Sequence, residues 1–481
     1  MKFGVVIRYV GLVLLFNAAF MLISALISLF NGFDTGFYPL LVSFLITSII
    51  GSFPLIFVPN DHNLSNKESY VIVAMSWVIS CLLGMLPYLI WGGEFSLTDA
   101  WFESTSGFTT TGATILSDIE ALPKGLLFWR ASTNWVGGVG VVLFALVILP
   151  SMGRMKMSLT SAEMSMMAKD NFRYTTKKIL KIIVFVYVGL TLCETVALTA
   201  VGMEPFDAVT NSFSTIATGG FCIRNQSIMY YDSVVIETIV LIFMLVAGIH
   251  MGLVYATICG KHNNMFRSEV TRFYILSIVI CTAIVAAGLL MNHNYSTFGE
   301  AIRYGTFQVV SHITTTGFAS TNDALWPPLA IITIIYCMIQ CSMAGSTSGG
   351  IKADRVLLIF KAIRARMLKL QHPNAVIRIK QNGITQDDGT VNAAILLVVI
   401  YMLSALGGTV LLTAMNIDLL TSFTAAISSL SNVGPGFGKI SNLDNFGALP
   451  AAAKWLLTGL MLFGRLEFFG FLHVFMLRSW K

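Results

Sequence analysis

Four short polar segments, each ending in glycine, recur along the chain between long apolar stretches. They read Thr109-Thr110-Thr111-Gly112, Ile216-Ala217-Thr218-Gly219, Thr314-Thr315-Thr316-Gly317 and Ser431-Asn432-Val433-Gly434. Glycine lets the main chain turn its carbonyl oxygens toward an axis, where a ring of carbonyls can replace the water around a cation. Because four such loops can surround one axis, the sequence predicts a cation pore formed by a single chain.

The composition requires a lipid environment. Of the 481 residues, 56% are hydrophobic and only 11% are charged, whereas soluble globular chains carry about 25% charged residues. No soluble fold can bury so much apolar surface. The net charge of +6 comes from basic residues between the apolar stretches, which favours a role in membrane topology over nucleic-acid binding.

Ten apolar stretches are long enough to cross a bilayer core, which needs roughly 20 residues per helix. We expect membrane spans at 9–31, 38–58, 70–91, 127–150, 180–202, 234–258, 272–291, 327–344 continued by 351–370, 393–415 and 450–477. The first lacks an A-x-A cleavage site and is too long for a secretory signal. Four further segments, beginning near Leu97, Phe206, Ala301 and Leu419, are too short to cross, and each ends in one of the polar loops.

The predicted fold is therefore an all-α membrane protein with pseudo-fourfold symmetry, like that of a K⁺ channel. Two leading helices (1–69) precede four repeats of helix, pore helix, filter loop and helix. The repeats occupy 70–152, 153–260, 261–371 and 372–481. The second and fourth repeats include a cytoplasmic loop, and the second helix of the third repeat is broken by a gate loop.

The distribution of charge predicts the orientation in the membrane. If the N-terminus is cytoplasmic, two basic segments lie inside: Arg154, Lys156, Lys169, Arg173, Lys177, Lys178 and Lys181, and then Lys352, Arg355, Lys361, Arg364, Arg366, Lys369, Arg378 and Lys380. This agrees with the positive-inside rule, places both termini in the cytoplasm and places all four filters outside. The outer side carries acids around the first filter: Glu94, Asp99, Glu103, Asp118 and Glu120. They either concentrate cations at the pore mouth or are ordinary solvated loop residues.

The filter loops are the predicted ion-binding site. We expect K⁺ to bind at Thr110, Thr111, Gly112, Ala217, Thr218, Gly219, Thr315, Thr316, Gly317, Asn432, Val433 and Gly434. Main-chain carbonyls and Thr or Ser hydroxyls are hard oxygen donors that suit alkali cations. The absence of Asp and Glu from the four loops disfavours a divalent cation. Flexible turns are the alternative interpretation, but four loops in the same hydropathy context argue against it.

A second polar segment, within the span 327–344 and its continuation, is the predicted gate. It comprises Gly345, Ser346, Thr347, Ser348, Gly349 and Gly350. Such residues cannot face lipid as irregular chain, because each unpaired amide costs several kcal/mol there. They must line a cavity or be buried, and below a filter they would obstruct the pore. The alternative is a static break in the helix.

Charged side chains within the predicted spans have few acceptable environments. Arg465 in the last span is expected to face the pore near the gate as a barrier to cations, or else to form a structural pair with a carbonyl or an acid. For Glu194 we expect a structural hydrogen bond. Arg130 and Lys454, which begin the second helices of the first and fourth repeats, are expected to be snorkelling anchors.

The sequence lacks the patterns of an enzyme. It contains no Walker motif, no soluble stretch able to form a nucleotide-binding domain, no metalloprotease spacing and no Ser-His-Asp set. The seven cysteines form no CxxC pair, which argues against a disulfide framework or a zinc site. His312 in the third pore helix is expected to be a packed residue. We therefore expect no enzymatic activity and no organic cofactor, with K⁺ as the bound ion.

Several motifs together resemble the Trk/Ktr/HKT superfamily of K⁺ transporters over essentially the whole chain. They are Trp129-Arg130, Trp135-Val136-Gly137-Gly138-Val139-Gly140, Thr109 to Thr114, Ala344 to Lys352, Asn432 to Gly438, and Gly464-Arg465-Leu466-Glu467. The two leading helices are most similar to the bacterial TrkH branch, because the KtrB branch lacks them. The pair His250-Met251 departs from the expected Asn-Phe, which puts the local helix packing in doubt.

The resemblance implies roles for some of these residues. The filter glycines Gly112, Gly219, Gly317 and Gly434 would favour K⁺ over Na⁺, whereas Na⁺-carrying plant relatives have Ser in the first loop. The gate loop corresponds to Gly345–Gly350 and the family's pore arginine to Arg465. The resemblance also implies a homodimer in a bacterial inner membrane, and a cytosolic ring of TrkA-type regulatory subunits that bind nucleotide.

The expected mechanism is uptake of K⁺ through one pore per chain, drawn inward by the membrane potential. One alternative is a symporter that couples K⁺ to H⁺ or Na⁺, although such carriers usually contain inverted repeats, and these four units share one orientation. A second is a Na⁺-permeable member of the same fold.

Overall fold

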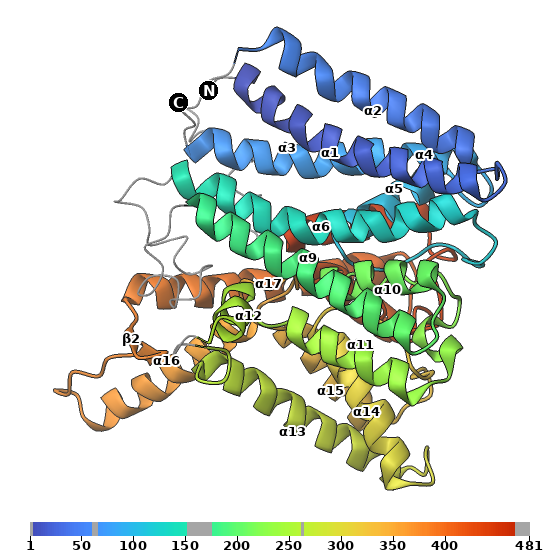
Figure 1. Ribbon diagram of the computed structural model, residues 1–481. Coiled ribbons are helices and arrows are strands. Elements are labelled where there is room, and N and C mark those ends of the chain that lie inside the picture. Colours follow the sequence, from blue (N-terminus) through green and yellow to red (C-terminus); the bar gives the residue numbers. More distant parts are fainter. Residues whose placement is uncertain (1–2, 60–65, 152–175, 261–263, 467–481) are drawn as a thin grey trace.

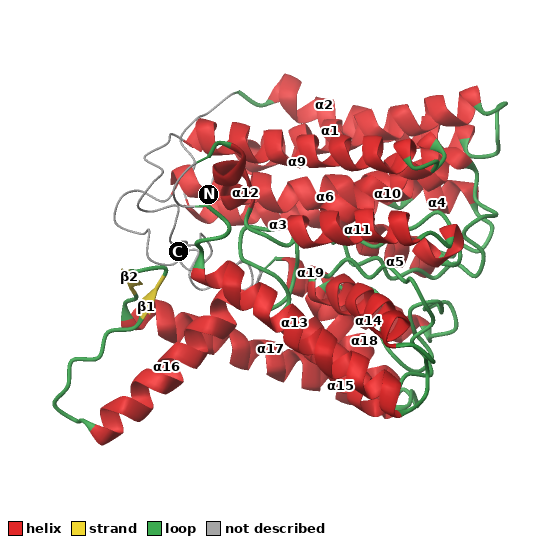
Figure 2. Cartoon of the chain, turned by 60° about the horizontal axis from the view of Figure 1, so that its bottom comes forward, coloured by secondary structure: helices red, strands yellow, loops and turns green. Residues whose placement is uncertain are grey.

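The computed structural model describes residues 3–59, 66–151, 176–260 and 264–466. Helices make up the regular structure of these residues apart from one small hairpin, in which β1 (Lys380–Gln381) pairs antiparallel with β2 (Ile384–Thr385) (Figure 1). The predicted all-α fold is therefore confirmed. Figure 2 shows the same bundle turned, with α16 projecting from its end beside the hairpin.

The helices can be grouped into a leading pair and four repeats, each of which contains one short helix that ends in a glycine-containing loop. The leading pair is α1 (Phe3–Phe30) and α2 (Phe37–Phe57). The first repeat comprises α3 (Asn66–Gly84), α4 (Leu86–Trp91), α5 (Leu97–Phe108) and α6 (Lys124–Ser151), and the second comprises α9 (Thr176–Ala200), α10 (Pro205–Ala217), a 3₁₀ turn η1 (Ser227–Tyr231), α11 (Val234–Ala247) and α12 (Met251–Ile258). The third contains α13 (Glu269–Met291), α14 (Phe298–Ile313), α15 (Pro328–Gln340) and α16 (Ala353–Gln371), and the fourth contains α17 (Asp388–Ala414), α18 (Leu419–Ser431) and α19 (Ala451–Arg465).

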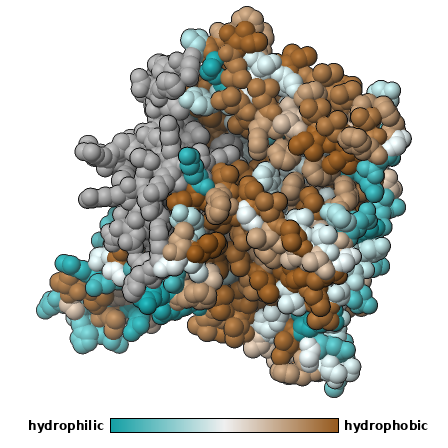
Figure 3. All heavy atoms as spheres, in the orientation of Figure 1, coloured by the Kyte–Doolittle hydropathy of each residue, from teal (hydrophilic) through white to brown (hydrophobic). Residues whose placement is uncertain are grey.

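Length and hydropathy show a multi-pass membrane protein. Six described helical segments are long and apolar enough to span a bilayer, namely α1, α2, Val71–Trp91, Lys181–Ala200, α13 and α17, and the bent pair α11–α12 raises the number to seven. Their outward side chains are largely apolar. In Figure 3 hydrophobic residues cover most of the visible middle, whereas hydrophilic residues gather at the right edge and at the lower left. A lipid solvent explains this distribution, since in water it would expose a large apolar surface.

The packing of helices closes the four repeats into a ring. In each repeat the helix after the filter packs against the pore helix of the next repeat: α6 against α10, α11 against α14, α15 against α18, and α19 back against α5. A cycle of four such contacts requires a common axis. The short helices α5, α10, α14 and α18 are therefore all members of this ring.

The leading pair packs on the outside of the first repeat, where α1 contacts α2, α3 and α6. Glycines allow the close approach of α1 and α2, since a methyl group on Gly11 would lie 2.5 Å from the carbonyl oxygen of Gly51. Asn17 of α1 donates a buried hydrogen bond to the Ser80 hydroxyl at 2.9 Å. The pair therefore extends the bundle without contributing a loop to its centre.

Two predicted spans differ from the structure. The span 234–258 is not straight: α11 ends at Ala247, α12 begins at Met251, and the two axes differ by 107°. The continuation 351–370 is not a span either, because α16 exposes Arg364, Arg366 and Lys369 and does not meet the length and hydropathy test for a membrane helix. Apolar composition alone could not reveal a bend whose residues are themselves mostly apolar.

Other predictions fall outside the described residues. These are the basic residues Arg154, Lys156, Lys169 and Arg173, the acid Glu467, and the end of the predicted span 450–477 after Leu466.

Candidate ion pathway

All four pore helices end with the same main-chain turn. Each is followed by a non-glycine residue in the left-handed region: Thr110 (φ 53°), Thr218 (φ 53°), Thr315 (φ 61°) and Asn432 (φ 57°). Two residues later comes a glycine with positive φ: Gly112 (78°), Gly220 (74°), Gly317 (76°) and Gly434 (103°). Glycine adopts this conformation at no steric cost, so the repeated turn explains why each loop contains one.

The second loop is shifted by one residue from the predicted register. Gly220, and not Gly219, is the positive-φ glycine equivalent to Gly112, and Gly219 corresponds to Thr111. The first loop has three threonines before its glycine, whereas the second has two glycines in succession, so the Thr/Gly pattern alone does not distinguish Gly219 from Gly220.

A serine six residues before the glycine marks the correct register. Its carbonyl oxygen accepts a hydrogen bond from the residue before the glycine in every loop: Ser106 from Thr111 (2.8 Å), Ser214 from Gly219 (2.8 Å), Ser311 from Thr316 (2.9 Å) and Ser428 from Val433 (3.0 Å). In three loops the serine hydroxyl also donates to the carbonyl of the turn glycine or of the residue after it: Ser214 to Phe221 (2.6 Å), Ser311 to Phe318 (2.7 Å) and Ser428 to Gly434 (2.8 Å). The spacing Ser-x₅-Gly was present in the sequence and could have located Gly220.

The four loops meet in a closed cycle. A methyl group added to each positive-φ glycine would lie within 3.0 Å of a carbonyl oxygen in the next repeat: Gly112 to Gly219, Gly220 to Thr316, Gly317 to Val433, and Gly434 to Thr111. The carbonyl before each glycine therefore lies against the glycine of a neighbouring loop. This arrangement brings the four carbonyls together around one axis, where glycine alone leaves enough room.

Threonine hydroxyls of the first and third filter loops form hydrogen bonds with one another. Thr109 and Thr111 share a hydrogen bond of 2.8 Å between their hydroxyls, and Thr314 and Thr316 share an equivalent bond of 2.8 Å. All four of these side chains are fully buried. Main-chain carbonyls are therefore candidate ion ligands, together with the buried Thr110 hydroxyl, which has no hydrogen-bond partner among the described residues.

The predicted gate loop lies directly beneath three of the four filter loops. The Thr347 hydroxyl donates to the carbonyl of Ile216 at 3.1 Å and lies 3.2 Å from the hydroxyl of Thr218. The amide of Gly349 donates to the Thr315 hydroxyl at 3.3 Å, and a methyl group on Gly349 would collide with the carbonyl of Ser431. The loop therefore contacts the second, third and fourth repeats.

Polar groups of the gate loop form hydrogen bonds with other groups of the protein. The Ser346 hydroxyl donates to the Met343 carbonyl at 2.6 Å and pairs with Ser348 at 2.8 Å. At the start of α16, Asp354 accepts from the amide of Ala344 at 2.6 Å. Burial of Ser346, Thr347 and Ser348 is nearly complete. The segment is thus enclosed in protein, as expected for irregular chain at membrane depth.

Arg465 at the end of α19 is held by this loop. Its guanidinium donates to the carbonyl of Thr347 at 2.8 Å and to the carbonyl of Gly137 in α6 at 3.3 Å. The positive charge therefore lies between the gate loop and the first repeat.

Comparison with known proteins identifies the family. A family model described as "TrkH: Cation transport protein" matches residues 40–479. The chain belongs to the TrkH family. It is 35% identical to the Trk system potassium uptake protein TrkH of Escherichia coli K12 over the whole of both chains, and 29% identical to TrkG of the same organism over 87% of this chain and 86% of TrkG. The crystal structure of the potassium transporter TrkH from Vibrio parahaemolyticus matches with a TM-score of 0.90 at 32% identity, covering both chains completely.

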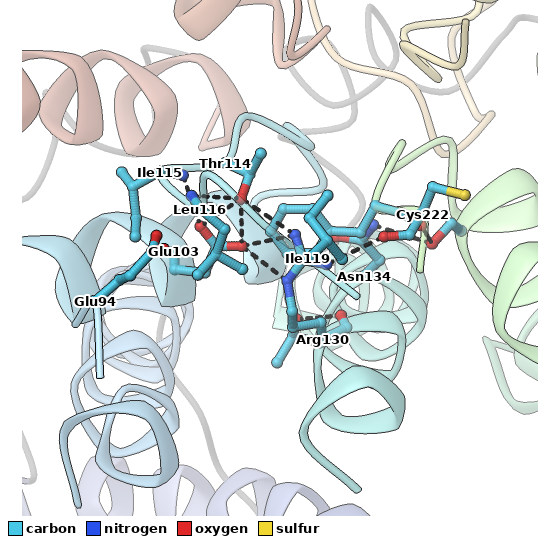
Figure 4. A network of polar contacts seen from close by, with 12 residues as sticks. Glu94, Glu103, Thr114, Ile115, Leu116, Ile119, Arg130, Asn134 and Cys222 are labelled. Carbon is cyan, nitrogen blue, oxygen red and sulfur yellow. Dashed lines mark hydrogen bonds and ion pairs between the residues drawn. The ribbon is translucent and has the colours of Figure 1, made fainter. Parts of the chain in front are cut away.

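In this TrkH-family chain Arg130 is not a snorkelling anchor, and Glu103 is not a solvated acid of the outer mouth. The two form a fully buried ion pair at 2.7 Å between α6 and α5. Figure 4 shows Glu103 facing Arg130, with Thr114 bonded to both. Glu103 also accepts from the amide of Ile115 at 3.1 Å, and Arg130 donates to the Cys222 carbonyl at 3.1 Å. The pair thus ties the exits of the first and second filter loops together.

Lys454 is likewise paired and not a snorkelling anchor. Its ammonium group donates to Asp99 at 2.6 Å and to the Gly447 carbonyl at 2.8 Å, which joins the fourth repeat to the first. Burial tends to raise the pKa of Asp99, but hydrogen bonds from Lys454 and Ser96 outweigh it and hold the pKa below its usual value. The prediction failed because the sequence places each base at a helix start but does not show which acid faces it.

The other two boundaries between repeats differ in chemistry. Arg303 of α14 forms a bidentate pair with Glu237 of α11, at 2.7 and 2.8 Å, between the second and third repeats. Between the third and fourth, Asn442 donates to the Thr321 carbonyl at 2.6 Å and accepts from the amide of Asp323. Asp323 is completely buried. Burial raises its pKa to about 8, against a smaller opposing effect of the main-chain amide of Asn442.

Two further polar residues with predicted roles, His312 and Glu194, are buried within the bundle. His312 is a packed residue, as expected: its Nδ1 lies 2.7 Å from the Gln308 carbonyl and its ring stacks on Phe437. Glu194 is fully buried in α9 beside Thr215 of α10.

Sequence reasoning missed Asn134 of α6, whose amide donates to the Ser214 hydroxyl at 3.3 Å behind the second filter loop. Its position as an amide in an apolar span was the available signal.

Proposed function

We propose that this TrkH-family chain carries K⁺ into a bacterial cell across the cytoplasmic membrane, through a pore on the axis of its four repeats. The observation that carries this proposal is the closed cycle of filter glycines and neighbouring carbonyls. The named function of the relatives, potassium uptake, supports the same choice of ion. A ring of carbonyls replaces the hydration shell of K⁺ without a charged ligand.

The path we infer begins at the outer mouth, passes the filter and ends at the gate loop. The filter comprises Thr110–Gly112, Thr218–Gly220, Thr315–Gly317 and Asn432–Gly434, with the second segment in the corrected register. Membrane potential supplies about 2.3 kcal/mol per charge for each 100 mV, inside negative. This energy is enough to draw K⁺ inward without coupling to another ion.

We further propose that the gate loop Gly345–Gly350 and Arg465 close the path below the filter. The loop's contacts with three filter loops support this, and so does the guanidinium bonded to Thr347. A positive charge beside the path disfavours cations there, and moving the loop would carry the Thr347 carbonyl away from that charge.

Assembly and orientation are part of the same proposal. We infer a homodimer with cytoplasmic termini, controlled by a cytosolic TrkA-type subunit that binds nucleotide. The basic residues of α16 and of the segment after it, including Arg364, Arg366 and Arg378, favour the cytoplasm for that end of the molecule.

Flux through liposomes containing the purified chain tests the function. We expect uptake of ⁸⁶Rb⁺, used as a tracer for K⁺, to exceed uptake of ²²Na⁺ under a potential negative inside, and to change when the regulatory subunit and nucleotide are added. Equal Rb⁺ and Na⁺ uptake would identify a Na⁺-permeable member of the fold.

Reversal potentials measured at several pH values are the second test. A shift of the reversal potential with the proton gradient would identify a coupled symporter.

A further inference from the structure

The elbow between α11 and α12 is the most unusual feature outside the filter. Here a span of the second repeat bends by 107° over three residues, Gly248 to His250. His250 caps α12, because its ring Nδ1 accepts a hydrogen bond from the amide of Gly252 at 2.9 Å. No side chain fits at Gly248, where a methyl group would lie 2.5 Å from the Tyr274 hydroxyl. Close packing and a cap therefore build the bend into the fold.

The main chain of this elbow is bonded directly to the gate segment of the third repeat. The amide of Met343 donates to the Gly248 carbonyl at 3.1 Å, and the amide of Met251 donates to the Gly345 carbonyl at 3.1 Å. The two bonds run in opposite directions between the same pair of segments. Such a pair resists both sliding and separation of the segments.

The imidazole ring of His250 is packed against the first glycine of the gate loop. A methyl group on Gly345 would lie 2.6 Å from Nε2 of His250, and Gly345 itself has φ +79°. Thr347, which contacts the second filter loop and Arg465, follows two residues later. The ring thus contacts the gate loop two residues before Thr347, which lies next to the proposed ion path.

We propose that His250 is a positioning residue for the gate loop, and that the elbow and the loop move as one unit. The ring holds Gly345 in place while the two main-chain bonds couple α12 to the loop. Displacement of α12 then moves Thr347 relative to the filter and to Arg465. This inference rests on the gating role proposed above for Gly345–Gly350.

His250→Asn separates the two contacts that the histidine makes. Asparagine is a good N-cap residue and can still accept from Gly252, but it has no ring to fill the space beside Gly345. We expect a folded protein whose basal ⁸⁶Rb⁺ flux, measured without the regulatory subunit, rises several-fold. The Rb⁺/Na⁺ ratio should not change, because the filter loops are untouched. His250→Ser, which also keeps a cap acceptor, provides a second variant if the first is unstable.

A double-mutant cycle with Gly345→Ala tests the contact itself. Alanine at this position carries the same φ strain in either background, but only the histidine ring collides with the new methyl group. We expect Gly345→Ala to alter basal flux strongly in the wild-type background and weakly in the His250→Asn background. Equal effects in the two backgrounds would overturn the proposal.

Two controls separate failure of this inference from failure of the proposed gate. His293→Asn replaces an exposed histidine in the turn after α13 and should leave flux at the wild-type level. Deletion of Gly345–Gly350 should raise flux if the loop is a gate. A deletion that raises flux, combined with an additive cycle, would reject only the role of His250. A deletion without effect would reject the gate as well.

Discussion

The four filter loops and the gate loop are joined directly by hydrogen bonds, but they are held in place in different ways. The filter consists of four near-copies, and each is held within its own repeat by a serine and a positive-φ glycine. The gate loop occurs once, in the third repeat, and is held by the second and fourth repeats, by Arg465 and by the elbow at Gly248–Met251. The proposed filter loops are therefore held largely by hydrogen bonds within each repeat, whereas the proposed gate loop is held by contacts with other repeats.

The largest expected effect comes from breaking the buried ion pair behind the filter. Arg130→Gln leaves Glu103 buried without its cation, which typically costs about 3–5 kcal/mol. We expect a large drop in thermal stability in detergent, and recovery of part of it in the double variant Glu103→Gln/Arg130→Gln. If Arg130→Gln is as stable as the wild type, the filter does not depend on this pair.

Replacing a filter glycine should abolish selectivity. Gly220→Ser forces a side chain toward the Thr316 carbonyl at φ +74°. We expect the Rb⁺/Na⁺ flux ratio to fall at least tenfold, or about 1.4 kcal/mol. Gly219→Ala is the comparison variant: its φ is not positive, and the atoms nearest its methyl group, at 2.5–2.9 Å, belong to the Asn134 side chain and not to a main-chain carbonyl, so we expect a smaller loss of selectivity. A more severe defect in Gly219→Ala would contradict the corrected register.

Changing the gate should affect rate without affecting selectivity. Arg465→Gln removes the positively charged guanidinium, which donates hydrogen bonds to the carbonyls of Thr347 and Gly137. We expect a several-fold increase in basal Rb⁺ flux at an unchanged Rb⁺/Na⁺ ratio, measured in the same liposomes. A change in the ratio would show that the gate loop also shapes the filter. The separation of selectivity in the filter from rate control in the gate would then be wrong.

The smallest expected effect is a pH dependence at the boundary between the third and fourth repeats. The pKa of Asp323 is raised from 3.8 to about 8 in the folded protein. The folded state therefore binds the extra proton, and this contribution to stability is complete below about pH 4 and is lost as pH rises through about 8. We expect the melting temperature to fall between about pH 5 and pH 8, to level off above that, and to fall less in Asp323→Asn. An identical pH slope in the two proteins would contradict this assignment.

Local patterns in the sequence predicted much of the fold. Apolar runs located most spans, and the recurring Thr/Gly loops located the ends of all four pore helices. The predicted register of the second loop was wrong because two glycines follow each other there, and only the serine spacing distinguishes Gly220 from Gly219. The elbow at Gly248 was missed because hydropathy is the same on both sides of it.

The sequence does not show which residues far apart in the chain pair with each other. Arg130 and Lys454 looked like interfacial anchors, since their positions at helix starts suit either role, and only the fold places Glu103 and Asp99 beside them. The same holds for His250, whose contact with Gly345 joins two repeats.

By itself the sequence determined a lipid-embedded helical chain with four alike filter loops, because hydropathy and glycine conformation act within a few residues. Only the tertiary structure decided which carbonyls meet around the axis, which charges are paired and what holds the gate loop. Those features depend on distances between segments about a hundred residues apart, which become defined only when the ring of repeats closes.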